Sequence, residues 1–242
     1  MNYNEFSLLY NEILSKNNLS RYIQDNICKK FYDFYNILVE TNKVMNVTRI
    51  LDAKDAILKH FADCLILADM IPEGEFSLID IGCGGGFPTI PLAIAKTNLK
   101  ITAIDSTTKK VDFVNSAAKT LGLGNVTAIS ARAEEFIEGK RESFDFASSR
   151  AVARLNMLDE LTLPYVKVGG KFFAMKGAAA DEELDEAKNG ISKLGGKCIE
   201  TLNFSLTDGE EINQRGVIVI EKVAKTPANY PRKFGQIKNK PL

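Results

Sequence analysis

Apolar residues recur at steps of three and four positions through the first 70 residues, which is the spacing of one face of an α-helix. This spacing predicts three helices, around residues 6–13, around 23–38 and over 54–70. Ser20 is placed to cap the start of the second helix, and Pro72 stops the third. We therefore expect a helical N-terminal segment.

From Ser77 onward, short apolar runs alternate with amphipathic stretches. Such runs are typical of strands buried on both faces of a mostly parallel sheet, with helices in the connections. The fold class that follows is α/β. The predicted strands are 78–81, 101–104, 126–129, 144–147 and 171–175, and the predicted helices between them are 89–96, 108–121, 154–165 and 181–194.

The last two predicted strands, near 198–206 and at 217–220, are too close in sequence for a crossover helix. Strands joined by a short loop form a hairpin, so one strand of the sheet must be antiparallel. Dehydrogenase-type folds do not usually end in this way, whereas methyltransferase folds do. We expect a helical extension over 1–72, a core over 73–223 and a tail over 224–242.

The composition is that of an ordinary globular protein. Lys and Arg total 31, as do Asp and Glu, so the whole surface carries no field that attracts a polyanion. The four cysteines are widely spaced and predict neither a disulfide framework nor a metal site. Because no secretory signal or membrane-spanning stretch is evident, we expect a cytoplasmic monomer without a metal or a membrane partner.

The most informative segment is the glycine-rich stretch from Asp80 to Pro88, Asp-Ile-Gly-Cys-Gly-Gly-Gly-Phe-Pro. It lies between a predicted strand and a predicted helix, where the chain must turn sharply and a ligand can approach the backbone. Unpaired N–H groups at the helix start favour an anionic or carboxylate group. Taken alone, such a loop is equally compatible with a dinucleotide site or a structural turn.

A carboxylate on the next strand narrows these alternatives. Asp105 ends that strand 19 residues after Gly86, where it can accept both ribose hydroxyls of a bound adenosine. The glycine spacing matches the D-x-G-x-G-x-G loop of S-adenosylmethionine enzymes rather than G-x-G-x-x-G. We therefore predict an S-adenosylmethionine site that includes Asp80, Gly82, Gly84, Gly86 and Asp105.

The segment after the third predicted strand lies near the edge where such folds hold the adenine ring. Ala133 and Glu134 are candidates for backbone and side-chain contacts to adenine. A solvated acidic turn, with Arg132 as its counter-charge, explains the same residues equally well.

The fourth predicted strand ends in Ser148, Ser149 and Arg150. It lacks both the Asn/Asp-Pro-Pro-aromatic motif for exocyclic amines and the Pro-Cys pair for C5 of pyrimidines. A target such as N7 of guanine has no proton to lose, so alignment and removal of water supply most of the rate. We expect no general base and give Arg150 a positioning role toward cofactor or RNA, with a strand-to-helix salt bridge as the alternative.

His60, the only histidine, lies three residues before Asp63 on the predicted third helix, so the two side chains share a face. We favour a structural or substrate-positioning role for His60 over a role as a catalytic base.

The C-terminal segment from Lys222 is basic and contains no Asp or Glu. Its prolines argue against a regular helix. Such a segment can lie along phosphates, and Tyr230 and Phe234 offer stacking surfaces. A disordered solubilising terminus is the alternative. The predicted RNA contacts are Lys225, Arg232, Lys233, Lys238 and Lys240.

Several motifs are distributed over nearly the whole chain: Asn42-Lys-Val-Met-Asn-Val-Thr48, His60-Phe-Ala-Asp63, Asp80 to Pro88, Ile104-Asp-Ser106, Ala133-Glu-Glu-Phe136, Ser149-Arg-Ala151 and Ala174-Met-Lys-Gly177. Together they resemble the ribosomal small-subunit methyltransferase G family, also called glucose-inhibited division protein B. The resemblance implies a Rossmann-like class I methyltransferase sheet and methyl transfer to N7 of a guanine in 16S rRNA of the small ribosomal subunit. It also implies cofactor contacts at Gly82, Phe87, Ala133, Glu134 and Arg150.

One departure from this family bears on the site. Thr89 stands where the family usually has Gly, beside the expected position of the cofactor's amino-acid end. It would either crowd that pocket or donate a hydrogen bond to it.

Two rival functions remain. The first is an NAD-dependent oxidoreductase that uses the same loop and Asp105. The second is a non-catalytic RNA-binding ribosome-assembly factor, against which the intact Asp80, glycines and Asp105 argue.

Overall fold

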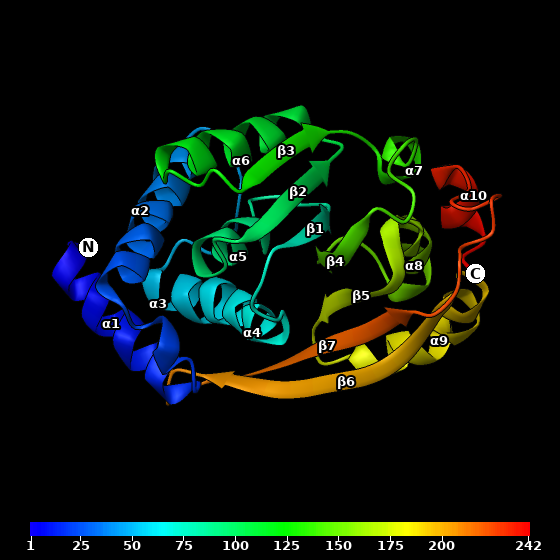
Figure 1. The fold of residues 1–242 in the computed structure, drawn as a ribbon. Coiled ribbons are helices and arrows are strands. Elements are labelled where there is room, and N and C mark those ends of the chain that lie inside the picture. The colour runs from blue at the N-terminus through cyan, green and yellow to red at the C-terminus, as the bar shows by residue number, and fades with distance from the viewer.

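A seven-stranded sheet with helices on both faces forms the centre of the computed structural model, which describes all residues from 1 to 242 (Figure 1). The strand order is β3-β2-β1-β4-β5-β7-β6, and β7 alone runs opposite to the other six strands. The predicted closing hairpin is confirmed. The strands are β1 (Phe76–Ile81), β2 (Leu99–Asp105), β3 (Val126–Ser130), β4 (Phe144–Arg150), β5 (Val166–Lys176), β6 (Gly196–Thr207) and β7 (Ile212–Lys222).

Helices precede the sheet and connect its strands, as predicted. Ser20 does not cap the second helix, because it begins a separate 3-10 turn, Ser20–Tyr22, and Gln24 precedes α2 without a side-chain cap. None of the helices combines the length and apolar character needed to cross a bilayer. The α-helices are α1 (Tyr3–Lys16), α2 (Asp25–Asn42), α3 (Ala53–Ala56), α4 (Asp63–Met70), α5 (Thr89–Ala95), α6 (Thr108–Thr120), α7 (Ala133–Phe136), α8 (Leu155–Thr162), α9 (Ala180–Lys193) and α10 (Phe234–Asn239).

Successive strand residues point to opposite faces of the sheet, and both faces are covered. In β5, Phe173 packs with the N-terminal helices, α5 and α6, whereas its neighbour Phe172 packs with α8 and α9. In β7, Val217 and Ile218 divide in the same way. Two-sided burial explains why these strands read as continuous apolar runs.

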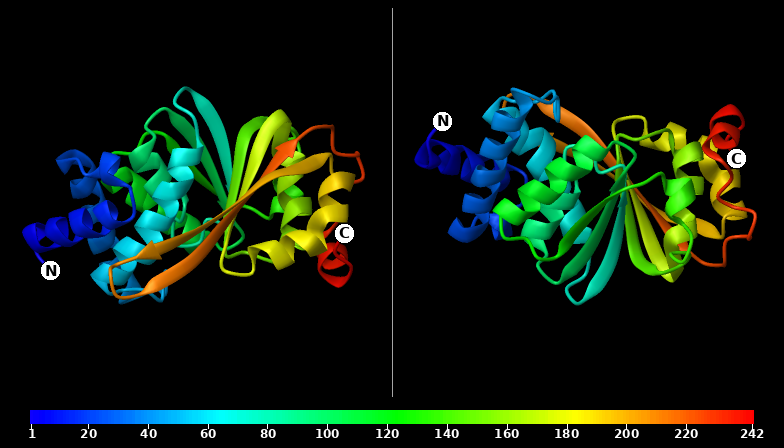
Figure 2. Two further views of the ribbon diagram at one scale, coloured as in Figure 1. Left: turned by 90° about the horizontal axis from the view of Figure 1, so that it is seen from below. Right: turned by 90° about the horizontal axis from the view of Figure 1, so that it is seen from above.

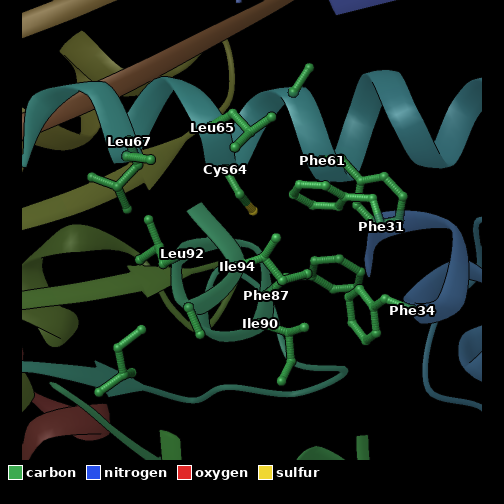
Figure 3. Close-up of a cluster of buried hydrophobic side chains, with 14 of the residues drawn as sticks. Phe31, Phe34, Phe61, Cys64, Leu65, Leu67, Phe87, Ile90, Leu92 and Ile94 are labelled. Atoms are coloured by element: carbon green, nitrogen blue, oxygen red, sulfur yellow. The ribbon is translucent and has the colours of Figure 1, made fainter. Parts of the chain in front are cut away.

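An aromatic cluster joins the N-terminal helices to the glycine loop (Figure 3). Phe31 and Phe34 from α2 meet Phe61 from the third helix, and Phe34 lies 5.4 Å from Phe87 between ring centroids. All four side chains are buried. The N-terminal extension therefore fixes the position of Phe87.

The third predicted helix forms, but its middle is π-helical. Ile57–Ala62 forms a π-helical segment between α3 and α4. No residue in this stretch predicts that geometry. π-Helical turns occur frequently at functional sites, and this one carries His60.

The long β6–β7 hairpin crosses the molecule and ends beside the C-terminus of α1 (Figures 1 and 2). The Asn17 side chain donates to the Thr207 carbonyl (2.7 Å) and accepts from the Thr207 N–H (2.9 Å). Lys16 Nζ donates to the Asp208 carbonyl at 2.6 Å. These bonds close the N-terminal helices against the far edge of the sheet.

The C-terminal segment contains a helix, contrary to the expectation that its prolines would prevent one. Pro231 precedes α10 and Pro241 follows it, so neither interrupts the helical hydrogen bonds. Ile237 on this helix is fully buried in the cluster that contains α8 and α9.

One carboxyl group of α8 is buried without full hydrogen bonding. Asp159 is 0% exposed and its Oδ2 has no partner, while Oδ1 accepts from the Glu160 N–H. Burial raises the pKa of Asp159 to about 8. The folded protein therefore holds a proton that the unfolded chain releases at lower pH.

This difference in pKa predicts a pH-dependent stability. The contribution of Asp159 is fully present below about pH 4 and is lost as pH rises to about 8, by up to about 1.4 kcal/mol per pH unit. Asp159→Asn cannot ionise at this position. We therefore expect its free energy of unfolding, measured with urea, to rise relative to that of the wild type between about pH 5 and about pH 8.5. Parallel pH profiles for the two proteins would contradict this assignment.

Candidate functional site

A cavity of about 460 Å³ opens where β1, β2, β3 and β4 end at the carboxyl edge of the sheet. The strand order reverses at β1, which pairs with β2 on one side and β4 on the other. Ligands of open α/β sheets bind at such a switch point, and the volume is in the range of small-molecule sites. The lining includes Gly82, Gly84, Phe87, Asp105, Ala133, Glu134 and Arg150, all predicted cofactor contacts.

Glycine is required in the loop after β1 for two separate reasons. Gly82 and Gly84 have φ angles of +76° and +51°, which side chains with a Cβ rarely adopt. Gly85 instead allows a close contact, because a Cβ there would lie 2.6 Å from the Val47 carbonyl oxygen. The loop after α2 therefore rests directly on the glycine loop.

Most amides of the glycine loop are already hydrogen-bonded within the protein. Both the Gly82 and Cys83 N–H groups donate to the Ile104 carbonyl, at 2.8 and 3.0 Å. Gly86 and Phe87 donate to the Cys83 carbonyl. These four amides fix the turn of the loop and precede α5 (Thr89–Ala95), so the expectation that amides at the helix start hold an anion stays a prediction.

Asp105 lies at the end of β2 with its carboxylate beside the glycine loop. Its Oδ2 accepts from the Gly84 N–H at 3.0 Å, and its Oδ1 accepts from the Thr107 N–H at 2.8 Å. Each carboxylate oxygen keeps a second lone pair. Asp105 can therefore accept ribose hydroxyls while it orders the loop.

Asp80 and Gly86 do not line the cavity, although both were predicted as cofactor residues. Asp80 is fully buried and accepts from the Thr89 hydroxyl at 2.6 Å and the Ser148 hydroxyl at 2.9 Å. A Cβ at Gly86 would meet Ile90, on the core side of the loop. Burial raises the pKa of Asp80 to about 6, against the effect of the two hydroxyls.

Thr89 does not line the cavity, although it was expected beside the cofactor's amino-acid end. Its hydroxyl is buried and points to Asp80. Thr89 and Ser148 together satisfy a carboxylate that would otherwise lose its hydrogen bonds on burial. Thr89 therefore has a structural role.

Ala133 and Glu134 line the cavity where the chain leaves β3. The Ala133 carbonyl accepts a hydrogen bond from the Tyr165 hydroxyl. That carbonyl is therefore held by the protein, and the Ala133 N–H is the backbone group left for a ligand.

Arg150, at the end of β4, connects the sheet to the third helix. Its Nη1 donates to Asp63 Oδ2 at 3.0 Å and to the Lys59 carbonyl at 3.2 Å, and its Nη2 lies 2.9 Å from His60 Nδ1. The guanidinium carbon lies 4.9 Å from the centre of the Phe87 ring. Arg150 thus forms the strand-to-helix salt bridge and also lines the cavity.

The hydrogen bonds of Arg150 determine the tautomer of His60. Because a guanidinium only donates, His60 Nδ1 accepts, and Nε2 carries the hydrogen and donates to Thr48 Oγ1 at 2.9 Å. The Ile50 N–H also donates to Thr48 Oγ1, at 3.1 Å. Thr48 therefore keeps its own hydrogen to donate, and it lines the cavity.

The charges of this cluster exclude a histidine base. Burial and the neighbouring Arg150 charge lower the pKa of His60 to about 3. Burial raises the pKa of Asp63, although Arg150 and Arg215, 3.7 Å away, favour the carboxylate. Neutral His60 thus bridges Thr48 and Arg150 and holds both side chains in place.

Sequence reasoning missed several lining residues that come from distant parts of the chain. Val47 and Thr48 belong to the Asn42–Thr48 motif, which was recognised but given no role. Asn42 Oδ1 accepts from the Val47 and Thr48 amides and so holds this loop over the cavity. No local pattern identifies Leu161 or Phe234, which reach the cavity from α8 and α10.

The predicted RNA-binding tail is only partly available. The Arg232 side chain forms an ion pair with Glu160, which is 0% exposed, at 2.6 Å, so it is not free to bind phosphate as predicted. Tyr230 is buried and is not a stacking surface. The four remaining predicted contacts are exposed: Lys225, Lys233, Lys238 and Lys240.

Comparison with known proteins identifies relatives along most of the chain. A family model described as rRNA small subunit methyltransferase G matches residues 27–212. The ribosomal RNA small subunit methyltransferase G of Staphylococcus saprophyticus is 42% identical over 222 residues, which cover 91% of this chain and 92% of that protein. The protein of the same name in Limosilactobacillus reuteri is 44% identical over 220 residues, with coverage of 88% and 90%.

Solved structures with low identity share the fold. An O-methyltransferase from Bacillus cereus, in complex with SAH, superposes with a TM-score of 0.55 at 15% identity and covers 78% of this chain and 90% of that chain. TYW2 from M. jannaschii, in complex with AdoMet, gives 0.53 at 16% identity, with coverage of 66% and 76%. These similarities confirm the predicted methyltransferase-type fold.

The contact between Gly85 and Val47 predicts a sensitive position. Gly85→Ala would force the 42–48 loop away from the glycine loop, and we expect S-adenosylmethionine binding to weaken at least about tenfold, because small displacements at a site are costly. Isothermal titration calorimetry measures this. Gly124→Ala is the control, since a Cβ there meets nothing within 4 Å. Equal loss of affinity in both variants would refute the steric explanation.

Proposed function

The chain belongs to the rRNA small subunit methyltransferase G family, and we propose that its cavity holds S-adenosylmethionine for methyl transfer to N7 of a guanine in 16S rRNA. The observation that carries this proposal is the junction of two features at one cavity. The carboxylate of Asp105 and the glycine loop lie on one side, and the Arg150–His60–Thr48 cluster lies on another.

The residues of the cavity suit the cofactor in polarity and in shape. Asp105 accepts the ribose hydroxyls, and the Ala133 N–H with the apolar walls from Ile81, Ile104 and Leu161 surrounds the adenosine. Gly82 and Gly84 admit the ligand close to the backbone. When bound, S-adenosylmethionine supplies an electrophilic methyl group on a positively charged sulfur.

The side chains around the cavity favour a target that needs no deprotonation. His60 stays neutral and has too low a pKa to act as a base near neutral pH. Cys83 lines the cavity, but burial raises the pKa of its thiol, which keeps it from acting as a nucleophile. N7 of guanine carries an in-plane lone pair and no hydrogen, so alignment and exclusion of water suffice.

Arg150 and Thr48 position the reacting groups in this proposal. Asp63 and His60 hold the guanidinium in one orientation over Phe87, which restricts its freedom to rotate. The Thr48 hydroxyl is left to donate to an acceptor on a bound ligand. The exposed Lys225, Lys233, Lys238 and Lys240 remain proposed contacts to RNA phosphate.

Membership of this family supports neither of the two rival functions. An oxidoreductase would bind a dinucleotide, and an assembly factor would retain RNA binding without transfer. A single methyl-transfer assay distinguishes both from the proposed function, because neither rival transfers a methyl group to RNA.

Transfer of labelled methyl groups to small ribosomal subunits from cells that lack this activity tests the proposal. We expect label on one guanine of the 16S rRNA, at a position that becomes sensitive to reduction and aniline cleavage because N7 methylation leaves a cationic, labile ring. Asp105→Ala, which removes the ribose acceptor, is the matched inactive control. Label on an exocyclic nitrogen, or none on RNA, would overturn the proposed chemistry.

Arg150→Lys separates charge from geometry at the cluster. Lysine keeps the charge but cannot bind Asp63 and His60 together, so we expect kcat/KM to fall by about 100-fold through misalignment. Arg154→Lys is the control, because its ion pairs with Glu182 and Glu186 are exposed. Steady-state kinetics with saturating small ribosomal subunits measure kcat/KM for S-adenosylmethionine in both variants. Wild-type activity in Arg150→Lys would show that only charge is needed there.

A further inference from the structure

The C-terminal segment is anchored on the body of the protein. Arg232 donates to Glu160 through its backbone N–H at 2.7 Å, Nε at 2.9 Å and Nη2 at 2.6 Å. Glu160 is 0% exposed, so this carboxylate depends on Arg232 for its hydrogen bonds. The buried Tyr230 and Ile237 lie on either side of the ion pair in sequence. The segment therefore has a fixed position against α8.

This anchoring places Phe234 at the cofactor cavity. α10 contacts α8 and lies near α7 (Figure 1). Phe234, the first residue of α10, lines the cavity together with Ala133 and Glu134 from α7 and Leu161 from α8. Phe234 is 37% exposed, whereas Ile237, one turn later, is fully buried. No other aromatic ring of the chain packs against Phe234, so one face of its side chain is available to a ligand.

We propose that Phe234 forms the adenine side of the cofactor site, so that the C-terminal segment binds the cofactor. This inference rests on the proposed function. Adenine is an aromatic base that stacks on phenylalanine rings, and this contact is apolar. The Ala133 N–H on the same wall supplies a polar contact to the ring edge. In this arrangement the ion pair of Arg232 and Glu160 holds the Phe234 ring in place at the cofactor site.

Calorimetric titration of two ligands tests the proposal. S-adenosylhomocysteine contains the amino-acid end, whereas 5′-methylthioadenosine lacks it. We expect Phe234→Ala to lower the affinity for both ligands by a similar factor, about tenfold, because only the contact to adenine is lost. Phe234→Tyr keeps the ring and should retain wild-type affinity. Leu8→Ala, at another exposed apolar side chain, is the control and should bind both ligands normally.

The possible results separate this inference from the proposed function. Unchanged affinity of Phe234→Ala for both ligands, or a loss for S-adenosylhomocysteine alone, would overturn the role of Phe234 while leaving the cofactor site intact. Failure of the wild type to bind either ligand would overturn the proposed function itself. Urea unfolding of Phe234→Ala, with a midpoint equal to that of the wild type, shows that a loss of affinity does not come from a loss of folding.

Discussion

The site depends on the hydrogen-bonded ion pair between Arg150 and Asp63. Both charges are largely withdrawn from water, so neither is stable there without the other. Because Arg150 ends β4 and Asp63 begins α4, the last helix of the N-terminal extension, their pairing fixes that helix against the switch point of the sheet. His60 and Thr48 extend the same network to the loop above the cavity.

The network also explains why the N-terminal helices belong to the site rather than merely to the core. The aromatic cluster holds Phe87 from below, and the Val47 carbonyl rests on Gly85 from above. The glycine loop is thus held between two parts of the N-terminal extension. Residues of the N-terminal extension, which a methyltransferase core alone does not contain, would shield a cofactor bound there from water. A transfer reaction that depends on alignment requires such exclusion of water.

Hydrogen-bond satisfaction accounts for two predicted site residues whose side chains bond to other protein groups. Asp80 lies two positions before the first glycine, yet it is fully buried, and the hydroxyls of Thr89 and Ser148 compensate its burial. Arg232 is basic and close to the C-terminus, yet its Nε and Nη2 donate to a buried carboxylate on α8. Ser148 lies 68 residues from Asp80 and Glu160 lies 72 residues from Arg232, so no local pattern could have identified these two partners.

The amino-acid sequence by itself determined the α/β fold, the order of the strands and of the helices other than α7 and α10, the closing hairpin, the glycine loop and Asp105. These follow from periodicity and from short motifs whose partners are neighbours along the chain or at adjacent strand ends. The tertiary structure alone decided which side chains reach the cavity. Thr48, Leu161 and Phe234 meet there only after distant segments pack together, and the same packing turns Gly86 and Asp80 away, because each buried polar group must find a partner wherever the fold supplies one.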